Sequence, residues 1–146
     1  MSTDRAPSGR VVRETSYGGV VLRGDDVLVI TPMGKRRVTG LPKGGADPAE
    51  TGEQAATREV REETGVTATV REPLGDVNYW YRRGGRRVYK TVHFYLCDYV
   101  SGSTDDHDHE VEEARWIPLG EARTALSYPG ERALIERTLS NSTPGR

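Results

Sequence analysis

The stretch GGADPAETGEQAATREVREETGV, from Gly44 to Val66, carries the strongest pattern in the chain. Its charges are unevenly spread, because Glu59, Glu62 and Glu63 fall within five residues. On an α-helix, which advances about 100° per residue, these carboxylates are related as i, i+3 and i+4 and leave one face. Three converging negative charges destabilise a helix and raise one another's pKa values unless a cation lies between them. The stretch therefore predicts a helix that carries a cation site.

The boundaries of this helix are marked by residues that cap helices well. Thr51 is an acceptable N-cap, and Gln54 stands three residues later, as a capping box requires. Gly65 follows the last helical residue, where a left-handed cap favours glycine. The preceding segment, GLPKGGADPAE at residues 40–50, is rich in glycine and proline, so we expect a loop there.

A hard divalent cation would relieve the crowding of the three carboxylates. Mg²⁺ prefers carboxylate and water oxygens, and it commonly uses a few protein ligands together with substrate phosphates. An open helix face with Glu59, Glu62 and Glu63 suits this chemistry. The alternative is a solvated acidic surface, and the EVREE run alone does not separate the two interpretations.

The composition predicts one globular domain. A chain of 146 residues, 34% of them hydrophobic, can bury a single core and is too short for two ordinary domains. We expect this domain at residues 11–140, between flexible tails at 1–10 and 141–146 that are rich in Ser, Thr, Pro and Gly. The formal net charge of −1 gives no general attraction to nucleic acids or acidic membranes, so we expect no specific nucleic-acid partner.

The single cysteine and the lack of long apolar runs indicate the cellular compartment. Cys97 lies among strand-forming residues and has no partner for an internal disulfide, so we interpret it as a packing residue. No apolar run approaches the ~20 residues that a membrane-spanning helix needs, and the first residues lack the apolar region of a secretory signal. The sequence therefore predicts a cytoplasmic protein with no membrane partner.

Strand-like and helical segments follow one another in an order typical of a mixed α/β sandwich. Two apolar strands joined by a tight turn at residues 23–26 come first, and residues 36–39 could extend or pair beside them. β-Branched and aromatic residues predict strands at 66–74, 75–83, 86–100 and 112–119. Apolar spacing predicts helices at 119–126 and 128–139, the second with Ala133, Leu134 and Leu139 facing inward.

The stretch that begins at Gly44 resembles the signature of the Nudix hydrolase family. That signature is glycine, five residues, glutamate, seven residues, then Arg-Glu-aliphatic-any-Glu-Glu-any-Gly-aliphatic. Its specified positions are all matched here, by Gly44, Glu50, Arg58, Glu59, Val60, Glu62, Glu63, Gly65 and Val66. The resemblance implies a loop–helix–loop catalytic motif on an α/β/α sandwich with a mixed central sheet. It also implies hydrolysis of a nucleoside diphosphate linked to a further group.

The resemblance assigns metal-binding roles to residues of the signature. Glu59 and Glu63, one helical turn apart, are expected to be direct ligands, with Glu62 on a second metal or a bound water. The backbone carbonyl of Lys43 is expected to reach the metal, and Gly44 to let the backbone turn tightly beside the helix. The expected cofactor is Mg²⁺, with Mn²⁺ as a substitute.

Catalytic roles follow from the same resemblance, with water attacking a phosphorus atom and no covalent nucleophile. Arg58 is expected to orient Glu59, while Glu50 caps the loop or reaches the metal through water. Glu62 is also a catalytic candidate. The general base comes from the helix or from a later loop, where Glu110, six residues before Trp116, is the candidate and Glu113 the alternative.

The segment DDHDHE at residues 105–110 also contains His107 and His109. These histidines alternate with acids and have no fixed partner spacing, whereas structural zinc sites need a closed set of four ligands. We therefore predict a solvated loop there.

Substrate candidates come from two further segments. The LPKG run places Lys43 beside the helix and resembles the form found in Nudix enzymes that act on dinucleoside polyphosphates and diphosphoinositol phosphates. The hairpin YWYRRGGRRVYK combines basic and aromatic residues, which suits a polyphosphate and a stacked base. Its candidates are Arg82, Arg83, Arg86, Arg87, Lys90 and Tyr79, interleaved with Trp80, Tyr81 and Tyr89. The alternative is a solvated strand pair whose charges protect an edge.

The segments KTVHFYL and LSYPGER resemble diadenosine polyphosphate hydrolases, in which a tyrosine near the last helix stacks on adenine; here that residue is Tyr128. The favoured prediction is hydrolysis of diadenosine polyphosphates such as the tetraphosphate, by a monomer or homodimer acting on a small nucleotide. The alternatives are a diphosphoinositol polyphosphate phosphohydrolase, a hydrolase of ordinary or oxidised nucleoside triphosphates, and a module that senses nucleotides without cleaving them.

Overall fold

The computed structural model describes residues 11–142, so residues 1–10 and 143–146 of the expected tails lie outside the described residues. Residues 141 and 142, which were predicted to begin the second tail, instead continue the last helix. The strands are β1 Val11–Arg23, β2 Asp26–Pro32, β3 Lys43–Gly44, β4 Val66–Arg83, β5 Arg86–Gly102 and β6 Val111–Pro118. The helices are α1 Gly52–Thr64, the short 3-10 helix η2 Thr104–Asp106, α2 Leu119–Ala125 and α3 Pro129–Ser142. In the described range, no helix has the length and apolar character to cross a membrane.

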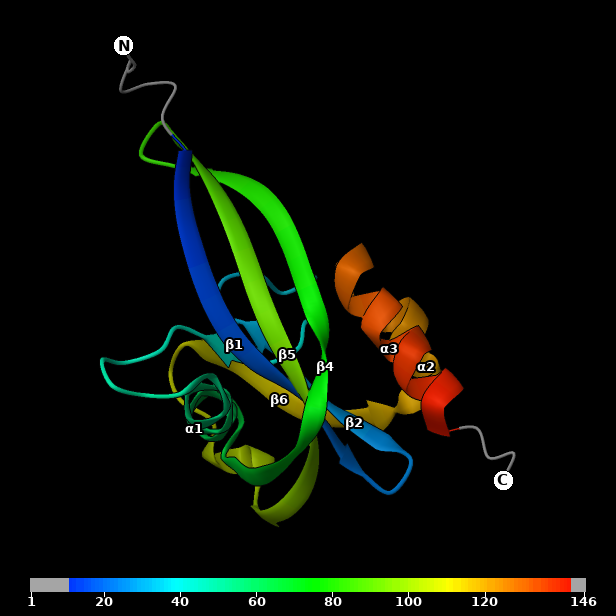
Figure 1. Cartoon of the computed structure of the whole chain (residues 1–146). Helices are drawn as coiled ribbons and strands as arrows, with labels where there is room; N and C mark the ends of the chain where they lie inside the picture. The colour runs from blue at the N-terminus through cyan, green and yellow to red at the C-terminus, as the bar shows by residue number, and fades with distance from the viewer. Residues whose placement is uncertain (1–10, 143–146) are drawn as a thin grey trace.

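The strands form one mixed sheet with the order β4-β5-β1-β2-β6, and β3 pairs with β1. Strands β1 and β5 run parallel, whereas the other pairs are antiparallel. Figure 1 shows α1 on one side of this sheet and α2 and α3 on the other. The predicted α/β sandwich with a mixed central sheet is confirmed.

Successive residues of the central strands supply cores on opposite faces of the sheet. Val20 packs in the cluster that includes Leu134 and Ile135 of α3, whereas Val21 packs in the cluster that includes Val60 of α1 and Cys97. This alternation follows from the two-residue repeat of a strand. Cys97 is fully buried, as predicted, and burial raises the pKa of its thiol to about 12.

Strands β1 and β2 diverge soon after their shared turn, and the segment 40–44 fills the gap between them. Gly40 forms an isolated bridge with Ile30, and Gly18 pairs with Lys43. A Cβ atom at Gly18 would lie 2.5 Å from the carbonyl oxygen of Pro42, so only glycine permits this approach. The segment predicted as a loop therefore contains a two-residue strand, because its backbone completes the sheet.

Two further predictions about strands differ from the structure. Residues 36–39 are not a strand, since the N–H of Val38 donates to the carbonyl of Lys35 in a turn, at 2.9 Å. The segments 66–74 and 75–83 form one strand, β4, whose register against β5 shifts at three places. These irregularities absorb Pro73 and Gly75, which had indicated a break between two strands.

Helix α3 begins near the predicted position but turns a different face to the core. Leu134 is buried and Leu139 is partly buried, whereas Ala133 is exposed. The buried positions are Glu131, Leu134, Ile135 and Thr138. This i, i+3, i+4, i+7 spacing is that of one helical face, so Ala133 was assigned wrongly because the face was read from the apolar residues alone.

Candidate active site

Helix α1 is fixed at both ends in the way its sequence predicts. The Thr51 side chain accepts a hydrogen bond from the N–H of Gln54 at 3.1 Å, and the Gln54 side chain accepts one from the N–H of Thr51 at 2.9 Å. Gly65 adopts the left-handed conformation, with φ of 80°. Val60 is fully buried against the sheet. The capped ends and the buried face together determine which way the carboxylates point.

Arg58 lies at the centre of a network that gathers the acidic residues. Its Nε donates to Glu50 Oε2 at 2.7 Å, and its Nη1 donates to Glu59 Oε2 at 3.3 Å and Glu62 Oε1 at 3.1 Å. Its Nη2 donates to the carbonyl of Gly45 at 2.8 Å. The hydrogen bond from Arg58 lowers the pKa of Glu50. One cation thus holds three carboxylates and the loop before the helix, which fits the orienting role predicted for Arg58.

Gly44 lies directly against the Glu59 carboxylate. A Cβ atom at this position would be 2.1 Å from Glu59 Cδ and 2.3 Å from its Oε2. The φ angle of Gly44 is outside the left-handed region, so a tight turn is not the reason for glycine. The expectation of a turn is therefore corrected: glycine leaves space for a carboxylate.

Two carboxylates of α1 are removed from water to different degrees. Burial raises the pKa of Glu63 to about 8, and its Oε1 accepts a hydrogen bond from the N–H of Lys43 at 3.0 Å. Burial also raises the pKa of Glu59, and the nearby charge of Glu62 acts in the same direction. Groups with this electrostatic character favour a bound cation, which would stabilise their ionised forms.

Mg²⁺ fits the oxygen donors at this place. Within residues 11–142, no three His, Cys, Asp or Glu side chains are already gathered as a metal site. Arg58 engages Glu59 and Glu62, while the N–H of Lys43 engages Glu63. Mg²⁺ needs few protein ligands. The carboxylates of α1 can supply them, and Glu59 lies so close to Gly44 that a side chain at residue 44 would clash with it. The residues that would hold it are Glu59, Glu62, Glu63 and the Lys43 carbonyl.

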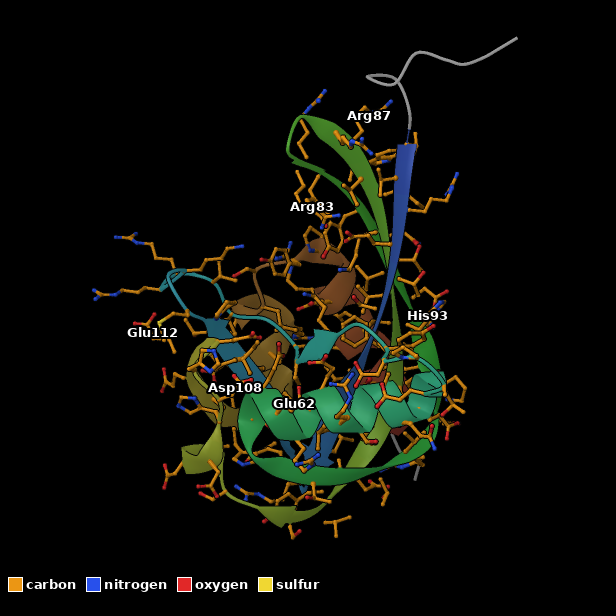
Figure 2. All side chains as sticks on the ribbon, turned by 90° about the vertical axis from the view of Figure 1, so that its left-hand side faces the viewer. Glu62, Arg83, Arg87, His93, Asp108 and Glu112 are labelled. Atoms are coloured by element: carbon orange, nitrogen blue, oxygen red, sulfur yellow. The ribbon has the colours of Figure 1, made fainter. Side chains whose placement is uncertain are left out.

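The loop before β6 packs against the end of α1. The N–H of Asp108 donates to the carbonyl of Glu62 at 3.0 Å, and the N–H of Glu110 donates to Asp108 Oδ1 at 3.0 Å. Figure 2 shows Asp108 beside Glu62. The charge of Glu110 contributes to raising the pKa of Glu59. The loop predicted to be solvated thus brings Glu110, and also Asp108, to the carboxylates.

Glu113, the alternative base, lies within β6 opposite Thr31. Its Oε1 is 3.6 Å from Nη1 of Arg115, which also donates to the Thr31 hydroxyl at 3.1 Å. The structure therefore gives Glu113 a cation partner on the sheet, and Glu110 remains the candidate base.

A cavity of about 280 Å³ lies on the sheet face that α3 covers. Its lining combines tyrosines, lysines, valines and one carboxyl group: Lys35, Lys43, Val77, Tyr79, Tyr81, Lys90, Val92, Tyr128 and Glu131. Four of the predicted substrate residues, Lys43, Lys90, Tyr79 and Tyr128, are among them. Lys43 thus has its side chain at the cavity and its N–H on Glu63, so the cavity and the carboxylate helix meet at this residue.

Glu131 was missed by the sequence reasoning. Its side chain is 3% exposed, and burial raises its pKa to about 7. Its Oε1 accepts a hydrogen bond from the N–H of Leu41 at 3.0 Å. The position of Glu131 three residues before Leu134 on the buried helical face is the signal that could have found it.

Glu14 organises the basic side chains on the cavity face of the hairpin, and it too was missed. It pairs with Arg83 and lies 3.5 Å from Lys90 Nζ, and it accepts a hydrogen bond from the Tyr81 hydroxyl at 2.5 Å. The hydrogen bonds from Tyr81 and Arg83 lower the pKa of Glu14 to about 2. Nothing near Glu14 in the sequence identifies these partners, because β1 meets β5 through a parallel pairing.

The four predicted arginines of the hairpin do not share one surface. Arg82 pairs with Arg87 across the strands, next to the pair of Trp80 and Tyr89, whereas Tyr79 and Lys90 point to the cavity face. The guanidinium of Arg87 lies 4.5 Å from the Trp80 ring centroid. Figure 2 shows Arg87 near the far end of the hairpin, away from Glu62. None of the four arginines lines the cavity, and their predicted phosphate contact stays a prediction.

A family model described as NUDIX domain matches residues 12–138, which is nearly the whole described range. The chain belongs to the Nudix family. This match lies inside the single domain predicted at residues 11–140.

Relatives of this Nudix chain include longer proteins. "Putative mutator protein MutT4" of Mycobacterium tuberculosis is 43% identical over 136 residues, which cover 87% of this chain and 55% of that protein. The "8-oxo-(d)GTP phosphatase" of Mycolicibacterium smegmatis is 37% identical over 97 residues, which cover 66% of this chain and 29% of that protein. The chain thus spans about half, or less, of the length of these relatives.

Solved structures share the fold. A "NUDIX hydrolase from Nitrosomonas europaea" superposes with a TM-score of 0.71 at 22% identity, covering 87% of this chain and 88% of that one. The C. elegans Ap4A hydrolase superposes with a TM-score of 0.64 at 24% identity, covering 92% of this chain and all of that one. At these identities the likeness concerns the fold.

Proposed function

We propose that the protein is a Mg²⁺-dependent pyrophosphohydrolase of nucleoside polyphosphates, with a purine nucleoside triphosphate as its main substrate. This proposal is carried by the position of Lys43 between the two parts of the site. Its backbone N–H donates a hydrogen bond to Glu63, and its side chain lines the cavity. A nucleotide that occupies the cavity would therefore extend its phosphates toward the carboxylates of α1.

The cavity suits one nucleoside. Tyr79 and Tyr128 are 38% and 40% exposed, so ring surface at the cavity is open to a base. Stacking on aromatic side chains stabilises a bound base by about 1 to 3 kcal/mol. The volume of about 280 Å³ is at the small end of ligand sites and favours one base with its sugar.

Lys43 and Lys90 supply positive charge for the phosphates at the same cavity. Lys90 is also 3.5 Å from Glu14, which fixes its position without removing it from the cavity. The placement of Arg82 and Arg87 weakens the earlier preference for a long phosphate chain and favours a shorter one.

Several side chains have roles in hydrolysis under this proposal. Bound Mg²⁺ supplies neutralisation of phosphate charge and a lower pKa for the attacking water. Glu110 would act as the general base toward the attacking water. Arg58 keeps Glu59 and Glu62 on one face while Glu50 holds Arg58. The roles of Arg58 and Glu50 follow from contacts that exist before any ligand binds.

The relatives support a triphosphate, because one of them is named an 8-oxo-(d)GTP phosphatase. A second candidate, diadenosine tetraphosphate, is favoured by Tyr128, whose exposed ring at the cavity could stack on adenine. The exposed Trp80 beside Arg87 offers a further aromatic surface for a second adenine.

A panel of nucleotides tests the proposal. The protein is incubated with Mg²⁺ and GTP, 8-oxo-dGTP, ATP, diadenosine tetraphosphate or an inositol pyrophosphate, and the products are separated by chromatography. We expect a nucleoside monophosphate and pyrophosphate from the purine triphosphates. Faster turnover of the tetraphosphate would favour the second candidate. Tight binding with no product from any compound would identify a nucleotide sensor and overturn the proposal.

A further inference from the structure

Glu131 presents a carboxyl oxygen to the cavity. The side chain is 3% exposed and lines the cavity, and its Oε1 accepts the hydrogen bond from the N–H of Leu41. Among the described residues, its second oxygen, Oε2, has no hydrogen bond. A buried carboxyl oxygen without a partner is costly, so the site favours a ligand that donates a hydrogen bond there.

The Leu41 contact also fixes the orientation of the carboxyl group. Leu41 itself is 1% exposed, and the neighbouring Gly40 is hydrogen-bonded to Ile30 on β2. Ser127, just before α3, donates to the carbonyl of Thr39 at 2.9 Å. The carboxyl group is thus held between α3 and a segment built into the sheet, which is the rigidity that selective recognition needs.

The aromatic neighbours of Glu131 indicate a base as the group that meets this oxygen. Tyr79 and Tyr128 line the same cavity, and burial raises the pKa of the Tyr79 hydroxyl, with the charge of Glu131 acting in the same direction. An ionised carboxylate can only accept hydrogen bonds. Guanine offers adjacent N1–H and N2–H donors on one edge, whereas the matching edge of adenine alternates a donor with an acceptor. The N6 amino group of adenine can donate to Oε2, but the N1 acceptor beside it would then lie against the carboxylate and be repelled, whereas N1–H of guanine supplies a second donor.

We propose that Glu131 is a specificity-determining residue that selects a guanine-type base by accepting its N–H donors in the cavity. This inference rests on the proposed function, since it names the base of the substrate. It assigns the two carboxylates that flank residues 41–43 to different tasks, with Glu63 at the phosphates and Glu131 at the base.

The substitution Glu131→Gln separates recognition from anchoring. Glutamine keeps an oxygen that accepts the Leu41 hydrogen bond and replaces the second oxygen with an NH₂ donor. The values of kcat/KM are measured for GTP, ITP and ATP with Mg²⁺ at pH 8, above the pKa of about 7 of Glu131. Inosine triphosphate keeps N1–H and lacks the N2 amino group. The control is Glu136→Gln, an exposed glutamate on the same helix.

The wild-type protein should prefer GTP over ITP and ITP over ATP. In Glu131→Gln, kcat/KM for GTP should fall by about 10-fold or more, while that for ATP stays the same or rises. Glu136→Gln should match the wild type. An equal loss for all three nucleotides would overturn the inference, because it would show that Glu131 only anchors Leu41.

The affinities of the wild-type protein for GDP, IDP and ADP are also measured at equilibrium. This measurement depends neither on catalysis nor on whether the variant folds. A preference for GDP supports the recognition of guanine even if no nucleotide is hydrolysed, in which case only the proposed function fails. Equal affinity for GDP and ADP overturns the inference even if both triphosphates are hydrolysed.

Discussion

The N–H of Lys43 donates a 3.0 Å hydrogen bond to Glu63 and so joins β3 to α1. Two residues earlier, the N–H of Leu41 donates to Glu131 of α3 at the same length. Helices on opposite faces of the sheet therefore hold one short backbone segment, α1 through the half-buried carboxyl group of Glu63 and α3 through the buried carboxyl group of Glu131. A substitution that removes either hydrogen bond is expected to affect both the cavity and the carboxylate helix.

The substitution Glu63→Gln tests the metal-binding role of this carboxylate. Glutamine can still accept the hydrogen bond from Lys43, so the fold should be retained. Loss of the negative charge should lower kcat by at least about 100-fold, the scale of lost electrostatic stabilisation at a reacting phosphate. Glu53→Gln, in the exposed first turn of α1, is the control and should keep full activity. Near-normal turnover in Glu63→Gln, measured with saturating Mg²⁺, would remove Glu63 from the metal site.

Gly44→Ala tests whether residue 44 must leave space for Glu59. A methyl group there would lie 2.1 Å from the Glu59 carboxyl carbon, so the carboxylate must move. We expect kcat to fall by about 10-fold or more, because displacement of a positioned ligand disturbs the reacting geometry. The neighbouring Gly45→Ala meets no atom within 4 Å and is a matched control. Equal activities of the two variants would show that the close contact between Gly44 and Glu59 does not affect catalysis.

The sequence predicted helix α1 and its carboxylates well because every determinant is local. Capping by Thr51 and Gly65 and the i, i+3, i+4 spacing of the glutamates depend on neighbours within a few turns of one helix. The mixed sheet was also predictable, since β-branched runs alternate with helical segments.

The cavity was only partly predictable, because its residues come from segments that are distant in sequence. Glu131 and Leu41 are 90 residues apart, and Tyr81 and Glu14 are 67 apart, so no local pattern joins them. The basic hairpin was also hard to interpret from its composition, because composition does not tell which face of the sheet each side chain occupies. Side chains alternate along a strand, which separates Arg82 from Tyr79.

The hairpin itself can be tested by comparing its two faces. Lys90→Met keeps most of the side chain and removes the charge at the cavity, so KM for a nucleoside triphosphate should rise by about 10-fold. Turnover at saturation should change little, since a group that binds ground and transition states alike alters KM alone. The double variant Arg82→Ala, Arg87→Ala should stay within about 2-fold of the wild type, as expected for screened surface charges. A rise in its KM for diadenosine tetraphosphate alone would restore the long-polyphosphate interpretation.

Glu131→Gln should also change how stability depends on pH. The pKa of Glu131 is about 7 in the folded protein, above the ordinary value of 4.5, so the folded state binds this proton more tightly than the unfolded state. Stability from this group is therefore complete below about pH 4.5 and is lost as pH rises through about 7.

The difference between the two proteins isolates this effect, because Glu63 and the other titrating groups are present in both. Relative to Glu131→Gln, the wild-type protein should lose up to about 3 kcal/mol of unfolding free energy between pH 4.5 and pH 7. Urea denaturation at several pH values measures the difference, with Glu136→Gln as the exposed control. Parallel curves for wild type and Glu131→Gln would mean that the Glu131 carboxyl titrates alike in the folded and unfolded states. In that event the cavity would be wetter than the burial of Glu131 implies, and its free oxygen would already be satisfied by water.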